Sequence, residues 1–295
     1  MKRLMMIINP AAGRSGFKTL FGEAMHILSR GGMQTSLFFT EGRRDATRLV
    51  EEYAQNFDVV ACVGGDGTLS EVLGGLMKVQ NPPPLGYFPM GTTNDVATSL
   101  NLPKNDMCAA AKRLLTGEAH PFDVGGFGKD EYFGYIAAFG AFTEISYATP
   151  QDQKKALGHL AYVLQGAAKL GKIERIPTHV EYDGGVFDGE LVYGSMSNST
   201  SVAGIVHLRE EMVSLGDGVS ELVLVRDPGR IDAYGELAAS VISRSFDSEY
   251  LQILHTTKAT FRFEKPVAWT RDGEAGGEHL EVTLCNYHAP VQFIF

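Results

Sequence analysis

The chain has 295 residues, of which 44% are hydrophobic, and its formal net charge at pH 7 is −9. A chain of this length can form one large domain or two modest ones with ordinary cores. The acidic balance argues against a nucleic-acid binder, which needs a basic surface, and against simple electrostatic adhesion to anionic membranes.

Short apolar runs alternate with helical patterns in the first part of the chain. We predict strands at residues 4–8, 35–39, 59–63 and 85–89, and helices at residues 17–28, 46–54, 68–77 and from 94 to 100. This alternation indicates a parallel sheet that is covered by helices on both faces. We therefore predict a doubly wound parallel α/β domain over residues 1–122.

The pattern changes after Phe122, where apolar and polar residues alternate between glycine-rich turns. We predict strands at residues 132–138, 179–182, 190–195, 220–225, 260–263, 280–284 and 291–295, and helices at residues 154–172 and 231–243. This pattern indicates an antiparallel, β-sandwich-like domain over residues 123–295. We expect the active site in the cleft between the two domains.

Three predicted strands of the first domain end in small, polar loops. These loops read Asn9-Pro10-Ala11-Ala12-Gly13-Arg14, Gly64-Gly65-Asp66-Gly67-Thr68 and Gly91-Thr92-Thr93-Asn94. Glycines let the backbone approach a ligand, and the N-terminus of a helix supplies N–H groups for phosphate. Because the carboxyl ends of parallel strands meet at one sheet edge, the three loops predict a nucleotide site. Each loop alone is equally consistent with a capped helix start.

Asp66 does not suit a bare phosphate site, because its carboxylate would repel the anion. It suits the site if a divalent cation lies between them, or if Asp66 orients donors around the ligand. Glu71, one helical turn beyond Thr68, is placed to serve the same site. By contrast, residues 166–173 nearly match a phosphate-binding P-loop, but Ile173 replaces the required Ser or Thr, so we predict a helix there.

Asp272-Gly273-Glu274 places two carboxylates around a glycine near the end of the chain. One interpretation is a hairpin turn, which Asp-Gly favours. The other is a contribution from the second domain to phosphoryl transfer, which needs a carboxylate to accept the proton of the attacking hydroxyl. Asp217-Gly218 allows the same turn interpretation. The three widely spaced cysteines form no CxxC or Cys/His cluster, which favours a reducing cytoplasm over a disulfide scaffold or a zinc site.

The ordered set of Gly64–Thr68, Gly91–Asp95 and Asp272–Glu274 resembles the diacylglycerol kinase catalytic superfamily. Within it, the chain is most similar to the bacterial soluble lipid kinases, which are related to sphingosine and ceramide kinases. The resemblance covers almost the whole chain, although the GGDGT pentad is shared with NAD kinases. It implies ATP and Mg²⁺ in the cleft, and a lipid alcohol such as diacylglycerol as the phosphoryl acceptor.

The resemblance also assigns roles to individual residues. The residues along ATP would be Asn9, Pro10, Ala11, Ala12, Gly13, Arg14, Thr40, Gly64, Gly65, Asp66, Gly67, Thr68, Leu69, Ser70, Glu71, Gly91, Thr92, Thr93 and Asn94. Asp66 would also act in catalysis by organising Mg²⁺. Asp272 or Glu274 would accept the proton, and we prefer Asp272 for its reach and position.

A structural magnesium ion is a further implication of the resemblance. Asp217 would be its side-chain ligand, carbonyl groups near Ser214 and Val219 would assist, and Asp123 would link it to the active site. The chain departs from the family where Ser70 replaces a usual Asn and Glu211-Met212 replaces the usual Pro-Asp before Asp217. The departure at Glu211-Met212 weakens the assignment of the structural metal.

Two other functions remain open: an NAD kinase-like soluble kinase, and a non-catalytic nucleotide-binding regulator. No apolar run approaches the roughly 20 residues of a membrane-spanning helix. We therefore expect a cytoplasmic protein that transiently contacts the inner membrane face, since its lipid must leave a bilayer, and that binds no nucleic acid. The sequence names neither the lipid nor the oligomeric state, for which a homodimer is one option.

Overall fold

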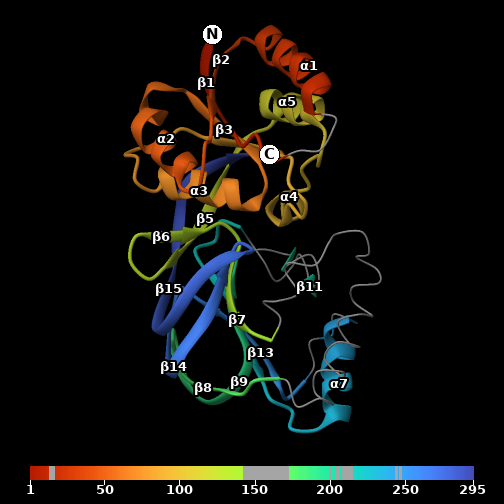
Figure 1. Ribbon diagram of the computed structural model, residues 1–295, viewed down its shortest axis with the longest axis vertical. Helices are drawn as coiled ribbons and strands as arrows, with labels where there is room; N and C mark the ends of the chain where they lie inside the picture. The colour runs from red at the N-terminus through yellow and green to blue at the C-terminus, as the bar shows by residue number, and fades with distance from the viewer. Residues whose placement is uncertain are drawn as a thin grey trace.

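The computed structural model describes residues 1–12, 17–141, 173–198, 201–202, 206–207, 215–242, 245 and 248–295. Figure 1 shows two lobes, one with a parallel sheet between helices and one dominated by antiparallel strands. This is the two-lobed α/β architecture that the sequence predicts. The helix predicted at residues 154–172 lies outside the described residues.

The first lobe contains a parallel sheet with the order β2-β1-β3-β4. Its strands are β1 (Lys2–Ile8), β2 (Met33–Phe39), β3 (Val59–Gly64) and β4 (Leu85–Pro89). Its helices are α1 (Phe17–Arg30), α2 (Asp45–Tyr53), the short η1 (Ala54–Asn56), α3 (Asp66–Leu76), α4 (Asp95–Ser99) and α5 (Met107–Thr116). The four predicted strands are confirmed, whereas α5 was not among the predicted helices.

The central strands of this sheet are apolar on both faces because helices cover both sides. Successive residues of β1 point to opposite faces, so Leu4 packs with Leu28 of α1, while Met5 packs in the same core as Val72 of α3. All five residues from Leu4 to Ile8 are fully buried. This explains why the sequence shows a continuous apolar run there instead of alternation.

The second lobe is built from antiparallel strands and the helix α7 (Ile231–Ile242). Its longer strands are β5 (Ala119–Phe127), β7 (Ile136–Gly140), β8 (Ile176–Tyr182), β9 (Gly185–Ser197), β12 (Ser220–Arg226), β13 (Leu251–Thr256), β14 (Lys258–Arg271) and β15 (Glu274–Ile294). The short strands are β6 (Glu131–Phe133), β10 (Ser201–Val202) and β11 (Val206–His207). The strand predicted at residues 132–138 is in fact two strands, and those predicted at 280–284 and 291–295 are parts of β15.

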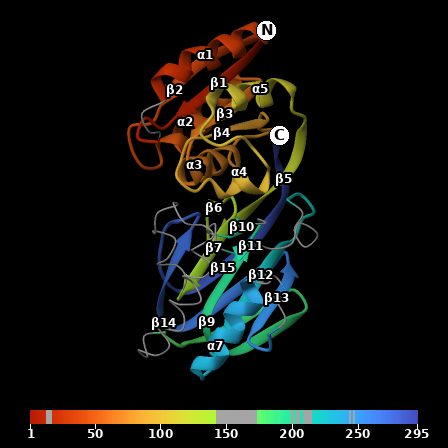
Figure 2. The ribbon, with the colours of Figure 1, turned by 90° about the vertical axis from the view of Figure 1, so that its right-hand side faces the viewer.

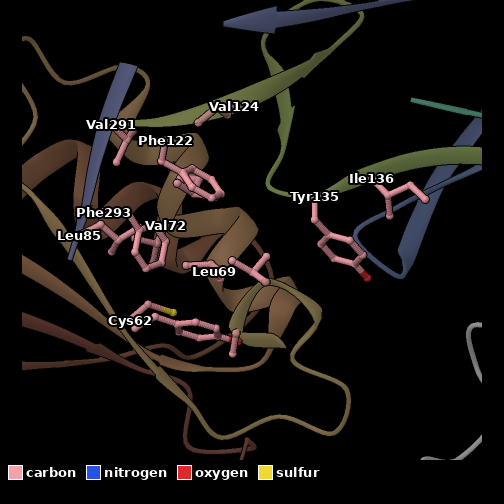
Figure 3. Packing of buried hydrophobic residues seen from close by; sticks show 14 of the residues in the cluster. Cys62, Leu69, Val72, Leu85, Phe122, Val124, Tyr135, Ile136, Val291 and Phe293 are labelled. Carbon is pink, nitrogen blue, oxygen red and sulfur yellow. The ribbon is translucent and has the colours of Figure 1, made fainter. Parts of the chain in front are cut away.

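Two long strands, β5 and β15, run from one lobe into the other and pair with each other. At the end of β15, Phe293 pairs in parallel with Leu85 of β4, which joins the strands of both lobes into one sheet. Figure 3 shows Phe122 and Phe293 packed close to Leu85 and Val72 in the core of the first lobe. The boundary at residues 122/123 falls inside β5 and stays a prediction.

Figure 2 shows the chain from the side, with both termini in the first lobe. The second lobe has its own core, in which Phe139, Phe261 and Trp269 pack ring against ring with centroids 4.8 to 5.6 Å apart. None of the described helices is long and apolar enough to cross a bilayer.

Candidate active site

The loops that follow β1, β3 and β4 meet at the carboxyl edge of the parallel sheet, as the sequence predicts. The Asn9 side-chain amide donates to the hydroxyl oxygen of Thr68 over 3.0 Å, which ties the first loop to the second. Gly65 and Gly91 bring the second and third loops together, since a Cβ added to Gly91 would lie 2.4 Å from the Cα of Gly65. Glycine at position 91 permits this approach, and a Cβ on Gly65 would also be tightly placed, 3.2 Å from the Cα of Gly91.

A cavity of about 750 Å³ opens between these loops and the second lobe. Many of its lining residues belong to the predicted nucleotide site: Asn9, Pro10, Ala11, Ala12, Thr40, Gly65, Gly67, Thr68, Ser70, Glu71, Gly91 and Thr92. Glu274, the alternative proton acceptor, also lines the cavity. The helix α3 begins at Asp66, so its N-terminal backbone lies in the wall. The free N–H groups and positive dipole end of such a terminus favour an anion.

Other predicted residues lie behind this wall or outside the described residues. Gly64 ends the buried strand β3, and Leu69 is part of the core. Asn94 is fully buried and holds its own loop, because its side-chain oxygen accepts a bond of 3.0 Å from the N–H of Gly91. Thr93 contributes a carbonyl that accepts from Lys104 over 2.8 Å. Gly13 and Arg14 lie outside the described residues.

Asp66 lies at the N-terminus of α3 in a strongly acidic environment. Its Oδ2 accepts a bond of 3.1 Å from the backbone N–H of Asp95, while its Oδ1 is buried without a hydrogen-bond partner among the described residues. Burial raises the pKa of Asp66 to about 7, and the nearby carboxylates of Asp95 and Asp272 contribute to this rise. The orphaned oxygen and the surplus of negative charge are what a bound cation would relieve.

Asp272 forms the hairpin turn that its sequence favours, whereas its role as proton acceptor stays a prediction. Asp272 and Gly273 have positive φ angles of 47° and 78° and form the tight turn between β14 and β15. The Asp272 carboxylate points inward and accepts backbone N–H bonds of 2.6, 3.0 and 3.1 Å from Gly134, Tyr135 and Ile136. Burial raises its pKa, which these bonds and one from the Ser70 hydroxyl partly offset.

The two remaining acidic candidates differ in their surroundings. Glu274 is exposed and lines the cavity, and its Oε1 would lie 3.0 Å from a Cβ added to Gly67. Glu71 binds the start of α2, because its carboxylate accepts from the backbone N–H groups of Arg44 and Ala46 over 2.7 and 3.2 Å. Glu71 thus fixes the loop that carries Thr40 on the opposite wall.

The cavity is also lined by four basic side chains to which the sequence gave no role: Arg43, Arg44, Lys78 and Arg271. Arg44 and Arg271 both contact Glu131, a further lining residue, at 2.7 and 2.8 Å. These residues carry no motif and come from three separate segments. Only the position of Arg271, directly before Asp272, gave a signal that sequence reasoning could have used.

The residues predicted around a structural metal are brought together in part. Asp123 is fully buried, and its carboxylate accepts from the N–H groups of Gly218 and Ala289 and from the side chains of Asn286 and His288, at 2.7 to 3.2 Å. The described residues contain no group of three His, Cys, Asp or Glu side chains that could hold a metal. Ser214 lies outside the described residues, and the metal at Asp217 and Val219 stays a prediction.

The contact between Gly65 and Gly91 leads to a stability prediction. Gly91→Ala should lower the free energy of unfolding by about 1–3 kcal/mol, because its methyl group would push the two loops apart. Gly22→Ala is the matched control, since a Cβ there meets nothing within 4 Å and the residue lies within a helix. Urea titration of both variants measures the difference, and equal midpoints for Gly91→Ala and the unaltered chain would refute the close-approach argument.

Comparison with known proteins is consistent with this geometry. The family model for the diacylglycerol kinase catalytic domain matches residues 3–127. The chain is 32% identical over 278 residues to "Diacylglycerol kinase" of Bacillus subtilis (strain 168), covering 94% of this chain and 91% of that protein. It is also 32% identical to "Diacylglycerol kinase" of Staphylococcus aureus (strain bovine RF122 / ET3-1), with 94% and 87% of the two chains covered.

Solved structures share the fold at lower identity. A crystal structure of a diacylglycerol kinase from Bacillus anthracis strain Sterne superposes with a TM-score of 0.75 at 21% identity, covering 100% of this chain and 97% of that chain. An NAD kinase from Archaeoglobus fulgidus, solved in complex with ATP, gives a TM-score of 0.54 at 16% identity, with 99% and 93% covered. The shared two-lobed fold therefore extends over the whole chain.

Proposed function

Because this chain belongs to the diacylglycerol kinase family, we propose that it is an ATP-dependent lipid kinase. The enzyme would transfer the γ-phosphoryl group of ATP to the hydroxyl group of a lipid such as diacylglycerol. The observation that carries the proposal is the convergence around one cavity of three phosphate-type loops and of Arg271 and Glu274, which flank the buried Asp272 in the second lobe.

In this mechanism the first lobe binds the nucleotide. The backbone of Gly65 to Thr68 and of Gly91 and Thr92 lies along the phosphates, at the positive end of α3. The first loop, from Asn9 to Ala12, and Thr40 form the facing wall. Phosphoryl transfer depends mainly on positioning and on charge stabilisation, and fixed backbone donors supply both.

The second lobe would supply the proton acceptor. Asp272 is our preferred base, because burial raises its pKa and so makes its carboxylate a stronger base than an ordinary aspartate. The three N–H bonds hold the carboxylate in one orientation, and Ser70, which lines the cavity, links it to the nucleotide wall. The lipid oxygen attacks phosphorus as its proton passes to Asp272 and ADP leaves. Glu274 is the alternative acceptor.

The family also implies a magnesium ion that accompanies the nucleotide. The buried, unpartnered Oδ1 of Asp66 fits such an ion, and the neighbouring Asp95 and Asp272 carboxylates increase the negative charge around it. The described residues do not offer three carboxylates as a complete site, so the remaining ligands would come from phosphate and water. When bound, the ion would neutralise charge on the phosphates.

The test is transfer of radiolabelled phosphate from ATP to a panel of lipid alcohols that includes diacylglycerol, with Asp272→Asn as the inactive control. We expect label in at least one lipid with the unaltered chain and almost none with the variant. A parallel incubation with NAD distinguishes the NAD kinase alternative. Tight ATP binding without phosphorylation of any acceptor would overturn the proposal and favour a non-catalytic regulator.

We further propose that the enzyme contacts the membrane surface transiently, because its acceptor resides in a bilayer. Co-sedimentation with phospholipid vesicles that contain diacylglycerol would measure this contact. The domain division at residues 1–122 and 123–295, the cytoplasmic location and a homodimer stay predictions.

A further inference from the structure

Glu131 holds two arginines at the wall of the cavity. Its Oε1 lies 2.7 Å from Nη2 of Arg44, and its Oε2 lies 2.8 Å from Nη1 of Arg271. Arg44 precedes α2 in the first lobe, whereas Arg271 ends β14 in the second. One carboxylate thus connects cationic groups from both lobes, and all three residues line the cavity.

Arg44 has an unusual backbone for a residue with a side chain. Its φ and ψ angles of 65° and 4° are left-handed, a region that residues with a Cβ mostly avoid. Its N–H donates to Glu71 over 2.7 Å, which holds this conformation in place. Backbone strain of this kind is concentrated at ligand sites. The conformation fixes the direction from which the guanidinium group reaches the cavity.

Arg271 is largely buried and is incompletely satisfied. Its side chain is 15% exposed, and its guanidinium carbon lies 5.5 Å from the centre of the Phe127 ring. Nη1 is buried and makes no aligned hydrogen bond to the described residues, despite lying 2.8 Å from Glu131. Glu131 therefore balances the charge of Arg271 but leaves one buried donor of this cavity-lining residue unused, which favours an additional oxygen ligand.

The charges of the residues that line the cavity affect how well it can bind a polyanion. Its lining includes five acidic residues, Glu41, Glu71, Asp130, Glu131 and Glu274, and four basic ones, Arg43, Arg44, Lys78 and Arg271. A polyanion would be poorly held there while Glu131 neutralises two of the four cations. Phosphate oxygens match the planar guanidinium fork at least as well as a carboxylate does.

We propose that Arg44 and Arg271 bind the phosphate groups of the nucleotide, and that Glu131 is a positioning residue that these phosphates displace. In the free protein Glu131 keeps both guanidinium groups at the cavity wall. When the nucleotide enters, its phosphates replace Glu131 as the partners of the two arginines, so that both lobes bind the same ligand. The inference rests on the proposed function and names the side chains that select a polyphosphate.

Calorimetric titration of the full chain with ATP, ADP and adenosine tests this assignment. Glu131→Gln removes the competing charge with little change in shape, so ATP should bind about five-fold more tightly, ADP by a smaller factor, and adenosine unchanged. Arg271→Gln should weaken ATP binding about ten-fold or more. In the double variant Glu131→Gln/Arg271→Gln, the increase in ATP affinity that Glu131→Gln causes should be smaller, because one of the two released arginines is missing.

Glu281→Gln is the matched control. It removes the same charge from a similar cluster outside the cavity, where Arg262 lies 2.8 Å from Glu281 and 2.7 Å from Glu181. If Glu131→Gln and Glu281→Gln change ATP affinity equally, or if adenosine gains as much as ATP, the assignment is wrong while the proposed kinase stands. If the unaltered chain binds no ATP, the proposed function fails together with this assignment.

Discussion

Asp272→Asn is expected to lower kcat for lipid phosphorylation by about 10²–10⁴-fold, the range that a general base contributes. An amide cannot accept the proton of the attacking hydroxyl. The side chain is otherwise similar in size, and its oxygen can still accept part of the N–H bonds from Gly134 to Ile136. The backbone N–H groups that hold the carboxylate do not line the cavity, so we expect ATP affinity to change little even though the Ser70 hydroxyl also bonds to Asp272. Steady-state kinetics at saturating ATP and lipid measure the effect.

Glu274→Gln is the paired variant, since Glu274 is exposed and lines the cavity on the other side of Gly273. A much smaller fall in kcat is expected for it. If Glu274→Gln abolishes turnover while Asp272→Asn retains it, the base is Glu274, and Asp272 serves the turn. Circular dichroism and ATP titration of both variants separate a loss of chemistry from a loss of the fold, because the Asn amide in Asp272→Asn must face buried N–H donors.

Asp66→Asn is expected to stabilise the protein while abolishing its activity. The folded-state pKa of Asp66 is about 7, against an ordinary value near 3.8, so the folded protein binds the extra proton between these values. The free energy of unfolding therefore falls as pH rises between these two pKa values, and the full loss of stability is present above pH 7. Removing the titrating group should raise the free energy of unfolding at pH 8 by roughly 2–4 kcal/mol, with little difference near pH 4.

Urea unfolding of the nucleotide-free chain in EDTA, at pH 4.5 and pH 8, provides the measurement. Asp58→Asn is the control with the opposite sign, because the backbone N–H of Arg3 lowers the pKa of Asp58. That variant should be less stable than the unaltered chain at both pH values, because pH 4.5 and pH 8 both lie above the ordinary aspartate pKa near 3.8. If Asp66→Asn is no more stable than the unaltered chain at pH 8, the carboxylate carries no buried charge. Such a gain at the expense of activity is common at functional sites.

Much of the first lobe follows from local sequence. Apolar runs such as residues 59–63, each followed by glycine and then a helical pattern, predict both the parallel strands and the edge at which their loops meet. α5 was missed because its apolar side packs on the sheet at Met107 and Leu114, and the alanines between them give no strong periodic signal. β15 was divided into two strands because its pairing with β5 is irregular between Tyr287 and Val291.

The candidate site was predictable where chemistry and turn propensity agree on the same residues. Asp272 is the clearest case, because the left-handed turn that Asp-Gly favours also turns the carboxylate inward, while its catalytic role stays a prediction. Glu71 illustrates the opposite case, since its spacing placed it correctly at the cavity but gave no sign that it binds the start of α2. The contacts of Glu131 depend on segments far apart in sequence, and no local pattern encodes them.

The pairing of Phe293 with Leu85 has a consequence for biosynthesis. The core of the first lobe is completed by Val291 and Phe293, so synthesis must pass residue 293 before that lobe can become fully native. Until then, the apolar side of β4 at Leu85 lacks its neighbour. A chain interrupted before residue 291 should therefore be a substrate for chaperones and proteases, even though every loop of its nucleotide site has already been synthesised.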